Sequence, residues 1–145
     1  MYDSWHYPGT VTDRAPYSIG GMERCLMAGK NSIILVVEDE AILRMQLCDD
    51  LEDQGYRVAD FPTGDEACSY LLTGGTCNLL LTDVRMPGKC DGLQLAKWVE
   101  GHHPNVPIIL MSSHLTGSQI GDREFVAKPY ETANLIKKVA DMLAA

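Results

Sequence analysis

The chain has 145 residues, of which 46% are hydrophobic and 22% charged, so it can build one packed domain and is not a disordered chain. Its 20 acidic and 12 basic side chains give a formal net charge of −8, which argues against nucleic-acid binding through a basic surface. No apolar run approaches the roughly 20 residues that span a bilayer, so we expect neither a nucleic-acid nor a membrane partner.

Residues 1–30 differ in composition from the rest of the chain. They are interrupted by proline and glycine, contain scattered aromatic residues, and show no sustained helical or strand period. Their charges balance, so the net charge of −8 lies in residues 31–145. They also lack the basic start and apolar stretch of a secretory signal. We expect a flexible N-terminal extension, with an aromatic docking arm as the alternative, followed by one domain over residues 31–145.

From residue 31 onward, short apolar segments alternate with amphipathic ones. We predict strands at residues 32–37, 56–61, 78–82, 106–111 and 124–127. We predict helices at residues 41–54, 65–72, 92–101 and 131–143. This alternation is typical of an α/β fold, an open, doubly wound, five-stranded parallel sheet with helices on both faces.

The cysteines give little sign of a disulfide framework or a zinc site. There are five, an odd number, and no two have C-x-x-C spacing: Cys25, Cys48, Cys68, Cys77 and Cys90. We expect reduced, partly buried thiols in a cytoplasmic protein.

Polar side chains follow four of the five predicted strands, and the second strand ends in no comparable group. These side chains are Glu38, Asp39, Asp83, Ser112, Ser113 and Lys128. Because the carboxyl ends of parallel strands meet at one edge of the sheet, we expect them to converge there. Taken singly, each has an ordinary explanation as a helix cap, a turn residue, a strand-end hydroxyl or a surface lysine. Their shared position is harder to explain in that way.

Three clustered carboxylates indicate a bound cation. They repel one another, and hard oxygen ligands with an open coordination sphere suit Mg²⁺, which commonly works beside a phosphate. A lysine and a serine hydroxyl supply further contacts for phosphoryl oxygens, and a carboxylate is a known covalent phosphoryl acceptor. The predicted edge therefore has the components of a phosphoryl-transfer site.

Five segments resemble one known family, the receiver domain of bacterial two-component response regulators of the single-domain, CheY-like type. They are Val37–Glu40, Leu81–Gly88, Asp91–Leu93, Pro107–Ser113 and Phe125–Pro129. The resemblance covers about residues 31–145, which is essentially everything after the N-terminal segment.

The resemblance implies a role for each site residue. Asp83 would accept the phosphoryl group from a sensor histidine kinase or a histidine phosphotransfer protein. Mg²⁺ would be bound by Glu38, Asp39 and Asp83 together with the backbone carbonyl of Arg85.

The resemblance also implies a switch. Ser112 and Lys128 would contact the phosphoryl group, Ser112 and Phe125 would move when it is present, and the bond between Lys128 and Pro129 would be cis. Phe125 stands at the position of the switch aromatic but lacks the hydroxyl of a tyrosine.

Two further features depart from the family pattern. The loop over residues 87–91 is one residue longer than the commonest form. The segment between Ser112 and Lys128 is too short for a full helix with its connections, contains Gly117 and Gly121, and lacks an amphipathic stripe. We therefore predict a fourth helix that is short, irregular or missing.

No effector domain follows within the sequence, so we expect a stand-alone receiver that catalyses only its own phosphorylation and dephosphorylation and is not otherwise an enzyme. Phosphorylation would switch a protein-binding surface for an unknown downstream protein. The alternatives are a phosphate sink and a phosphorylation-independent docking domain of the same fold. A phosphohydrolase is disfavoured, because the second aspartate that such enzymes commonly carry is replaced by Arg85.

Overall fold

The computed structural model describes residues 31–114 and 117–145, and the predicted N-terminal extension lies outside them. The strands are β1 (Ile33–Val37), β2 (Arg57–Phe61), β3 (Leu79–Asp83), β4 (Ile108–Ser112) and β5 (Glu124–Ala127). The helices are α2 (Ala41–Asp53), α3 (Gly64–Leu72), α4 (Gly92–His102), α5 (Gly117–Ile120) and α6 (Thr132–Ala144). The predicted elements are present, and their ends differ from the predicted ones by at most two residues.

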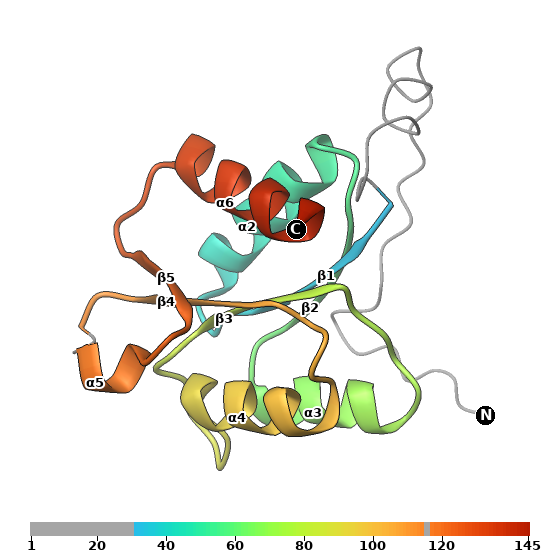
Figure 1. The fold of residues 1–145 in the computed structure, drawn as a ribbon, viewed down its shortest axis with the longest axis vertical. Helices are drawn as coiled ribbons and strands as arrows, with labels where there is room; N and C mark the ends of the chain where they lie inside the picture. Colours follow the sequence, from blue (N-terminus) through green and yellow to red (C-terminus); the bar gives the residue numbers. More distant parts are fainter. Residues whose placement is uncertain (1–30, 115–116) are drawn as a thin grey trace.

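The five strands form one parallel sheet in the order β2-β1-β3-β4-β5. Helices α2 and α6 cover one face, and α3 and α4 cover the other (Figure 1). The chain reverses its direction along the sheet after β2, so the carboxyl ends of β1 and β3 lie side by side at the switch point. The predicted doubly wound α/β fold is confirmed.

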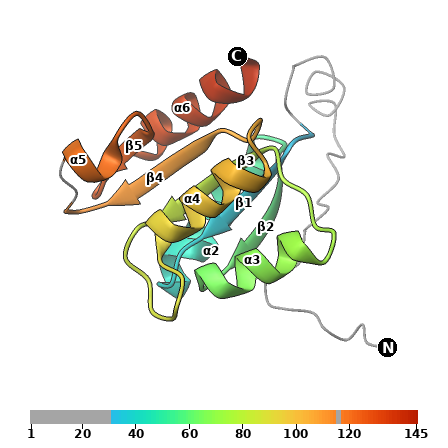
Figure 2. The ribbon, with the colours of Figure 1, turned by 60° about the horizontal axis from the view of Figure 1, so that its bottom comes forward.

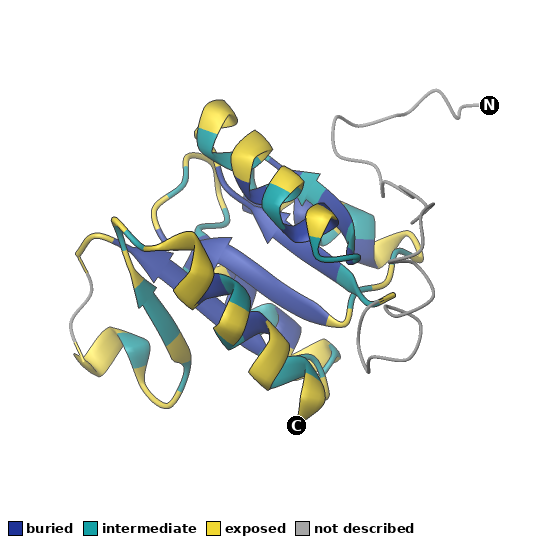
Figure 3. Cartoon of the chain, turned by 90° about the horizontal axis from the view of Figure 1, so that it is seen from above, coloured by how far each residue is buried: buried dark blue, intermediate teal, exposed yellow. Residues whose placement is uncertain are grey.

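The central strands are apolar on both faces because each face is covered by helices. In β1, Leu35 packs in the core layer under α3 and α4, whereas Ile34 packs in the layer under α2 and α6. Figure 3 shows the buried sheet between helices that are exposed only on their outer sides. Burial on both faces explains why the strand reads as an uninterrupted apolar run and not as an alternating one.

Helix α5 is a single turn at one end of the sheet (Figure 2). It is followed directly by Gly121, whose φ of +62° is a conformation that suits glycine. None of its residues is buried, and no residue of β5 is fully buried either. The predicted shortening of the fourth helix is therefore confirmed, and β5 is less covered than the other strands.

No helix within residues 31–114 and 117–145 combines the length and the apolar character needed to cross a membrane.

The start of α4 is packed directly against the end of β3. The Gly92 amide donates a hydrogen bond to the Val84 carbonyl at 2.9 Å. A Cβ atom at Gly92 would overlap the carbonyl oxygen of Asp83 and lie 2.7 Å from the Cα of Val84. Asp91 and Gln94 close a reciprocal capping box at the same point. Glycine is therefore required here by the close approach of two backbones.

Replacing Gly92 by alanine is expected to lower the free energy of unfolding by about 2 kcal/mol or more, because neither backbone can retreat without disturbing Asp83. The matched control is Gly101→Ala in the same helix, where a Cβ atom would meet nothing within 4 Å. The free energy of unfolding of that control is expected to equal or exceed the wild-type value by up to about 1 kcal/mol. Urea unfolding followed by circular dichroism measures both. Equal effects in the two variants would contradict the close-contact explanation.

Candidate functional site

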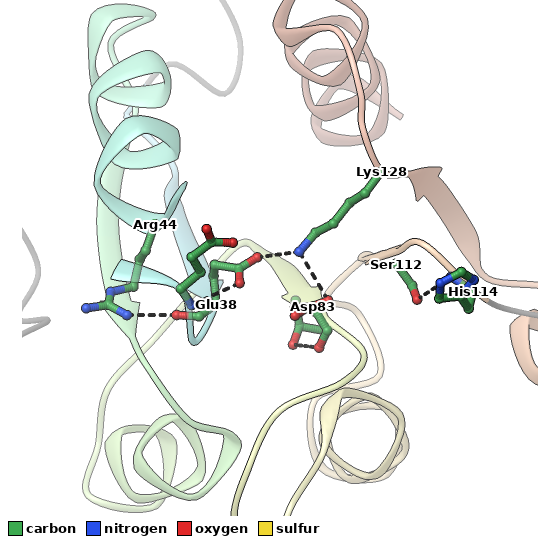
Figure 4. Close-up of polar contacts among 8 residues, drawn as sticks. Glu38, Arg44, Asp83, Ser112, His114 and Lys128 are labelled. Atoms are coloured by element: carbon green, nitrogen blue, oxygen red, sulfur yellow. Dashed lines mark hydrogen bonds and ion pairs between the residues drawn. The ribbon is translucent and has the colours of Figure 1, made fainter. Parts of the chain in front are cut away.

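Four predicted site residues converge at the carboxyl edge of the sheet (Figure 4). Glu38 follows β1 directly, Asp83 ends β3, Ser112 ends β4, and Lys128 follows β5. These four strands are consecutive in the sheet, so their ends form a row. Glu38, Asp83 and Ser112 are each buried, at 1%, 6% and 3% exposure. Buried polar groups at strand ends are expected to serve a site or a partner.

Lys128 follows the edge strand β5, and its side chain reaches the carboxylates at the ends of β1 and β3. Its Nζ atom donates to Glu38 Oε1 at 2.8 Å and lies 3.4 Å from Asp83 Oδ1. The Lys128 amide also donates to the Ser112 carbonyl at 3.0 Å, and the peptide bond to Pro129 is cis, as predicted. One ammonium group therefore lies between two buried carboxylates.

Burial sets the protonation behaviour of this cluster. It raises the pKa of Glu38, although the hydrogen bond from Lys128 opposes the change. Burial also raises the pKa of Asp83, with Lys128 opposing and the charge of Asp39 adding to the rise. For Lys128, burial alone would lower the pKa, but the hydrogen bond to Glu38 and the charge of Asp83 outweigh it and raise the pKa. The carboxylates are thus only partly compensated by the single lysine.

Glu38, Asp39 and Asp83 form the one group of three metal-binding side chains found among residues 31–114 and 117–145. One carboxylate oxygen from each lies within 4.8 Å of the others. Asp39 is exposed, so the cluster opens to solvent on that side. Oxygen ligands with room for water fit Mg²⁺, and a divalent cation would relieve the repulsion that one lysine leaves. Arg85 lies two residues beyond Asp83, at the start of the loop that borders the cluster.

The two predicted switch residues have different surroundings. The Ser112 hydroxyl accepts a hydrogen bond from the His114 amide at 3.1 Å and so faces its own loop (Figure 4). Phe125 is half-buried and packs against the core layer under α3 and α4. The structure places Ser112 at the edge of the site, at the end of β4, whereas Phe125 lies within β5 and three residues before Lys128.

Arg44 and Asp60 also support the site, and the sequence analysis missed them. Arg44 Nη1 donates to the Glu38 carbonyl at 2.8 Å, while its Nε donates to Asp60 Oδ2 at 3.1 Å. Burial raises the pKa of Asp60, and the charge of Arg44 opposes the rise. Arg44 therefore fixes the backbone that carries Glu38. A charged residue inside a mostly buried strand was the available signal, and Asp60 lies one residue before the end of β2.

A family model of the response regulator receiver domain matches residues 34–140. The chain belongs to the response regulator receiver domain family. The matched residues include all five strands, apart from the first residue of β1, and the whole cluster around Lys128.

Curated relatives of this receiver chain are longer transcriptional regulators. The chain is 32% identical over 108 residues to the DNA-binding transcriptional regulator NtrC of Salmonella typhimurium, a match that covers 70% of the chain and 23% of NtrC. It is 32% identical to the uncharacterized transcriptional regulatory protein YkoG of Bacillus subtilis, covering 73% of the chain and 48% of YkoG. The match thus spans less than half of each of these proteins.

Solved structures agree with the receiver fold. A response regulator receiver protein from Sinorhizobium medicae has a TM-score of 0.74 and 32% identity, covering 79% of this chain and 96% of that one. The response regulator TrrA from Thermotoga maritima, solved in complex with Mg²⁺ and BeF, has a TM-score of 0.69 and 28% identity, covering 77% and 98%.

Adding Mg²⁺ is expected to raise the thermal midpoint of the receiver chain, because a cation bound only by the folded state stabilises it. At about 100 times the dissociation constant the gain is about 2.7 kcal/mol, a shift of several degrees. Glu38→Gln and Asp83→Asn should remove most of the shift. Asp141→Asn, which changes an exposed carboxylate paired with Lys137, is the control and should keep it. A full shift in Asp83→Asn would contradict this site.

Without metal, Asp83→Asn is expected to stabilise the protein at pH 7. The folded pKa of Asp83 is raised, so its stabilising contribution is complete below the unfolded value of about 4 and is lost as pH rises through the folded value. Urea unfolding in the presence of a chelator measures the free energy of unfolding between pH 4 and pH 7. This free energy should decline less with rising pH in the variant than in wild type. A variant that is less stable than wild type at pH 7 would mean that the attraction between Lys128 and Asp83 outweighs burial.

Proposed function

We propose that this chain is a phosphoacceptor in two-component signalling. Asp83 accepts a phosphoryl group from a phosphohistidine of a sensor kinase or a histidine phosphotransfer protein. Mg²⁺ is bound by Glu38, Asp39, Asp83 and the backbone carbonyl of Arg85. The observation that supports this best is the Lys128 ammonium group, 2.8 Å from Glu38 Oε1 and 3.4 Å from Asp83 Oδ1.

The chemistry follows from these positions. An Asp83 carboxylate oxygen attacks the phosphorus, the phosphorus–nitrogen bond of the donor breaks, and the donor histidine leaves with the electron pair of that bond. The metal supplies charge neutralisation for the phosphoryl oxygens when it is bound. Lys128 already lies at an Asp83 oxygen, so its ammonium group meets the new negative charge without a large movement.

A hollow of about 310 Å³ lies beside the loop that follows Asp83, and Val84 is among its lining residues. Its position supports the proposal that a donor reaches the acceptor from this side. Arg85, Met86 and His114 are among the residues that line it. It lies on the side where the Ser112 hydroxyl is held by the His114 amide. The hydroxyl uses an oxygen lone pair to accept from His114, so its O–H group can donate to another acceptor, and a phosphoryl group on Asp83 would be a charged one. Ser112 then moves toward Asp83, and Phe125 follows it.

We propose that this movement changes a protein-binding surface, by shifting the balance between two arrangements. We also propose that residues 31–145 act as one receiver unit. That the receiver acts without an effector domain stays a prediction, and so does its downstream partner. The longer relatives named above are described as transcriptional regulators, and that output is a property of those proteins.

Incubation of the full chain with acetyl phosphate and Mg²⁺ is expected to add about 80 Da, the mass of one phosphoryl group, to the intact protein. The gain should require Mg²⁺ and be absent in Asp83→Asn. The control Asp141→Asn, an exposed carboxylate on α6, should label as wild type does. Intact-protein mass spectrometry measures all three.

Labelling that persists in Asp83→Asn would overturn the assignment of the acceptor. If wild type gains no mass from acetyl phosphate or from candidate kinases, the phosphorylation-independent docking domain replaces the phosphoacceptor as the proposed function.

A further inference from the structure

Two cysteines from distant parts of the chain meet beside the loop that follows Asp83. Cys68 lies in the middle of α3, and Cys90 lies near the end of the loop between β3 and α4. The two thiols are close enough that each shifts the pKa of the other. The Cys90 thiol donates a long hydrogen bond to the Asp91 carbonyl, at 3.7 Å. Both side chains are partly buried and pack against the same core layer, and both are free thiols.

The loop between β3 and α4 packs closely against the first turn of α3 near Cys90. A Cβ atom at Gly64, one turn before Cys68, would overlap the Cys90 carbonyl oxygen and lie 3.2 Å from the Cys90 sulfur. The neighbouring Lys89 amide donates to Asp65 Oδ2 at 3.3 Å. Glycine at the first position of α3 therefore lets the loop approach closely, and the approach places the Cys90 sulfur along the helix surface toward Cys68.

The surroundings of the pair favour a bond between the sulfurs over a shared metal ion. Within residues 31–114 and 117–145, the one group of three metal-binding side chains is the carboxylate cluster at Asp83, so the two thiols have no third ligand there. A structural metal site in proteins usually needs four ligands. Two adjacent thiols without further ligands are suited to a two-electron oxidation.

We propose that Cys68 and Cys90 form a reversible disulfide that fastens the loop between β3 and α4 to α3. The oxidant is a low-molecular-weight disulfide such as oxidised glutathione. One thiolate attacks it, forming a mixed disulfide and releasing one glutathione thiolate. The second protein thiolate then attacks the mixed disulfide and releases the other. The two cysteines lose two protons and two electrons, and one oxidised glutathione becomes two reduced ones.

The environment of the pair sets the rate of this exchange. Burial raises the pKa of Cys68, and burial together with the neighbouring Cys68 raises the pKa of Cys90 to about 12. Thiolates are the reacting species, so they are scarce near neutral pH and oxidation accelerates as pH rises. The pair is therefore expected to oxidise slowly near neutral pH.

The disulfide would act on a loop that borders the acceptor. That loop begins with Val84, which follows Asp83, and includes Arg85. A covalent bond between Cys90 and α3 would restrict the backbone of the loop from Val84 to Cys90. The inference goes beyond the proposed phosphoacceptor function and does not depend on it, because the bond is detected without any phosphoryl donor.

The test is to treat the full, folded chain with oxidised glutathione from pH 7 to 9 and to map the peptides without reduction. A peptide linking Cys68 to Cys90 is expected, with a mass roughly 2 Da below the sum of the reduced peptides because two hydrogens are lost. Its yield should rise with pH, and dithiothreitol should reverse it. Hydrogen exchange at the Lys89 amide should be slower in the oxidised form.

Four cysteine variants make the result specific. Cys68→Ala and Cys90→Ala should each abolish the intramolecular link, while Cys48→Ala, a half-buried cysteine on α2, should keep it. Circular dichroism checks that each variant is folded, and Cys25→Ala removes exchange with the N-terminal thiol. If folded wild type gives only glutathione adducts, other pairings or no reaction at any pH, the proposal is overturned. Phosphoryl labelling at Asp83 is unaffected by that outcome, so the two proposals fail separately.

Discussion

The structure depends on one ammonium group shared by two buried carboxylates. Without Lys128, Glu38 and Asp83 would be buried anions with no cation, and each would carry the full cost of leaving water. With it, one positive charge offsets part of two negative ones, and a residual demand for positive charge remains. A divalent cation bound beside the carboxylates would relieve that imbalance.

Most of the fold was predictable because the sheet is buried on both faces. The apolar run from Ile33 to Val37 is typical of a central strand. Glycine and proline residues mark the boundaries of several of the other elements. The candidate site was predictable for a related reason. Parallel topology places every strand end at the same edge, so linear positions translate directly into neighbours. Some strand ends differed by one or two residues because terminal pairing depends on partners that the sequence does not display.

What sequence reasoning missed were contacts between elements that share no pattern. Arg44 resembles any polar residue of an amphipathic helix, and only the folded geometry shows that it spans Asp60 and the Glu38 carbonyl. The contact between Cys68 and Cys90 was equally hidden, since their spacing matches no motif and the approach depends on Gly64. The orientation of the Ser112 hydroxyl depends on a loop amide, which no residue pattern encodes.

The single-turn helix α5 has a consequence for local stability. Strand β5 lies at the edge of the sheet, where β4 is its one pairing partner within residues 31–114 and 117–145, and none of its residues is fully buried. We therefore expect it to open locally more easily than the other strands. The ion pair between Lys138 and Glu124 and the one between Arg123 and Glu100 fasten its beginning to α6 and α4. Its other end carries Lys128. Fraying of this edge would withdraw the ammonium group from both carboxylates at once, so the stability of β5 sets how long the charge balance at the site persists.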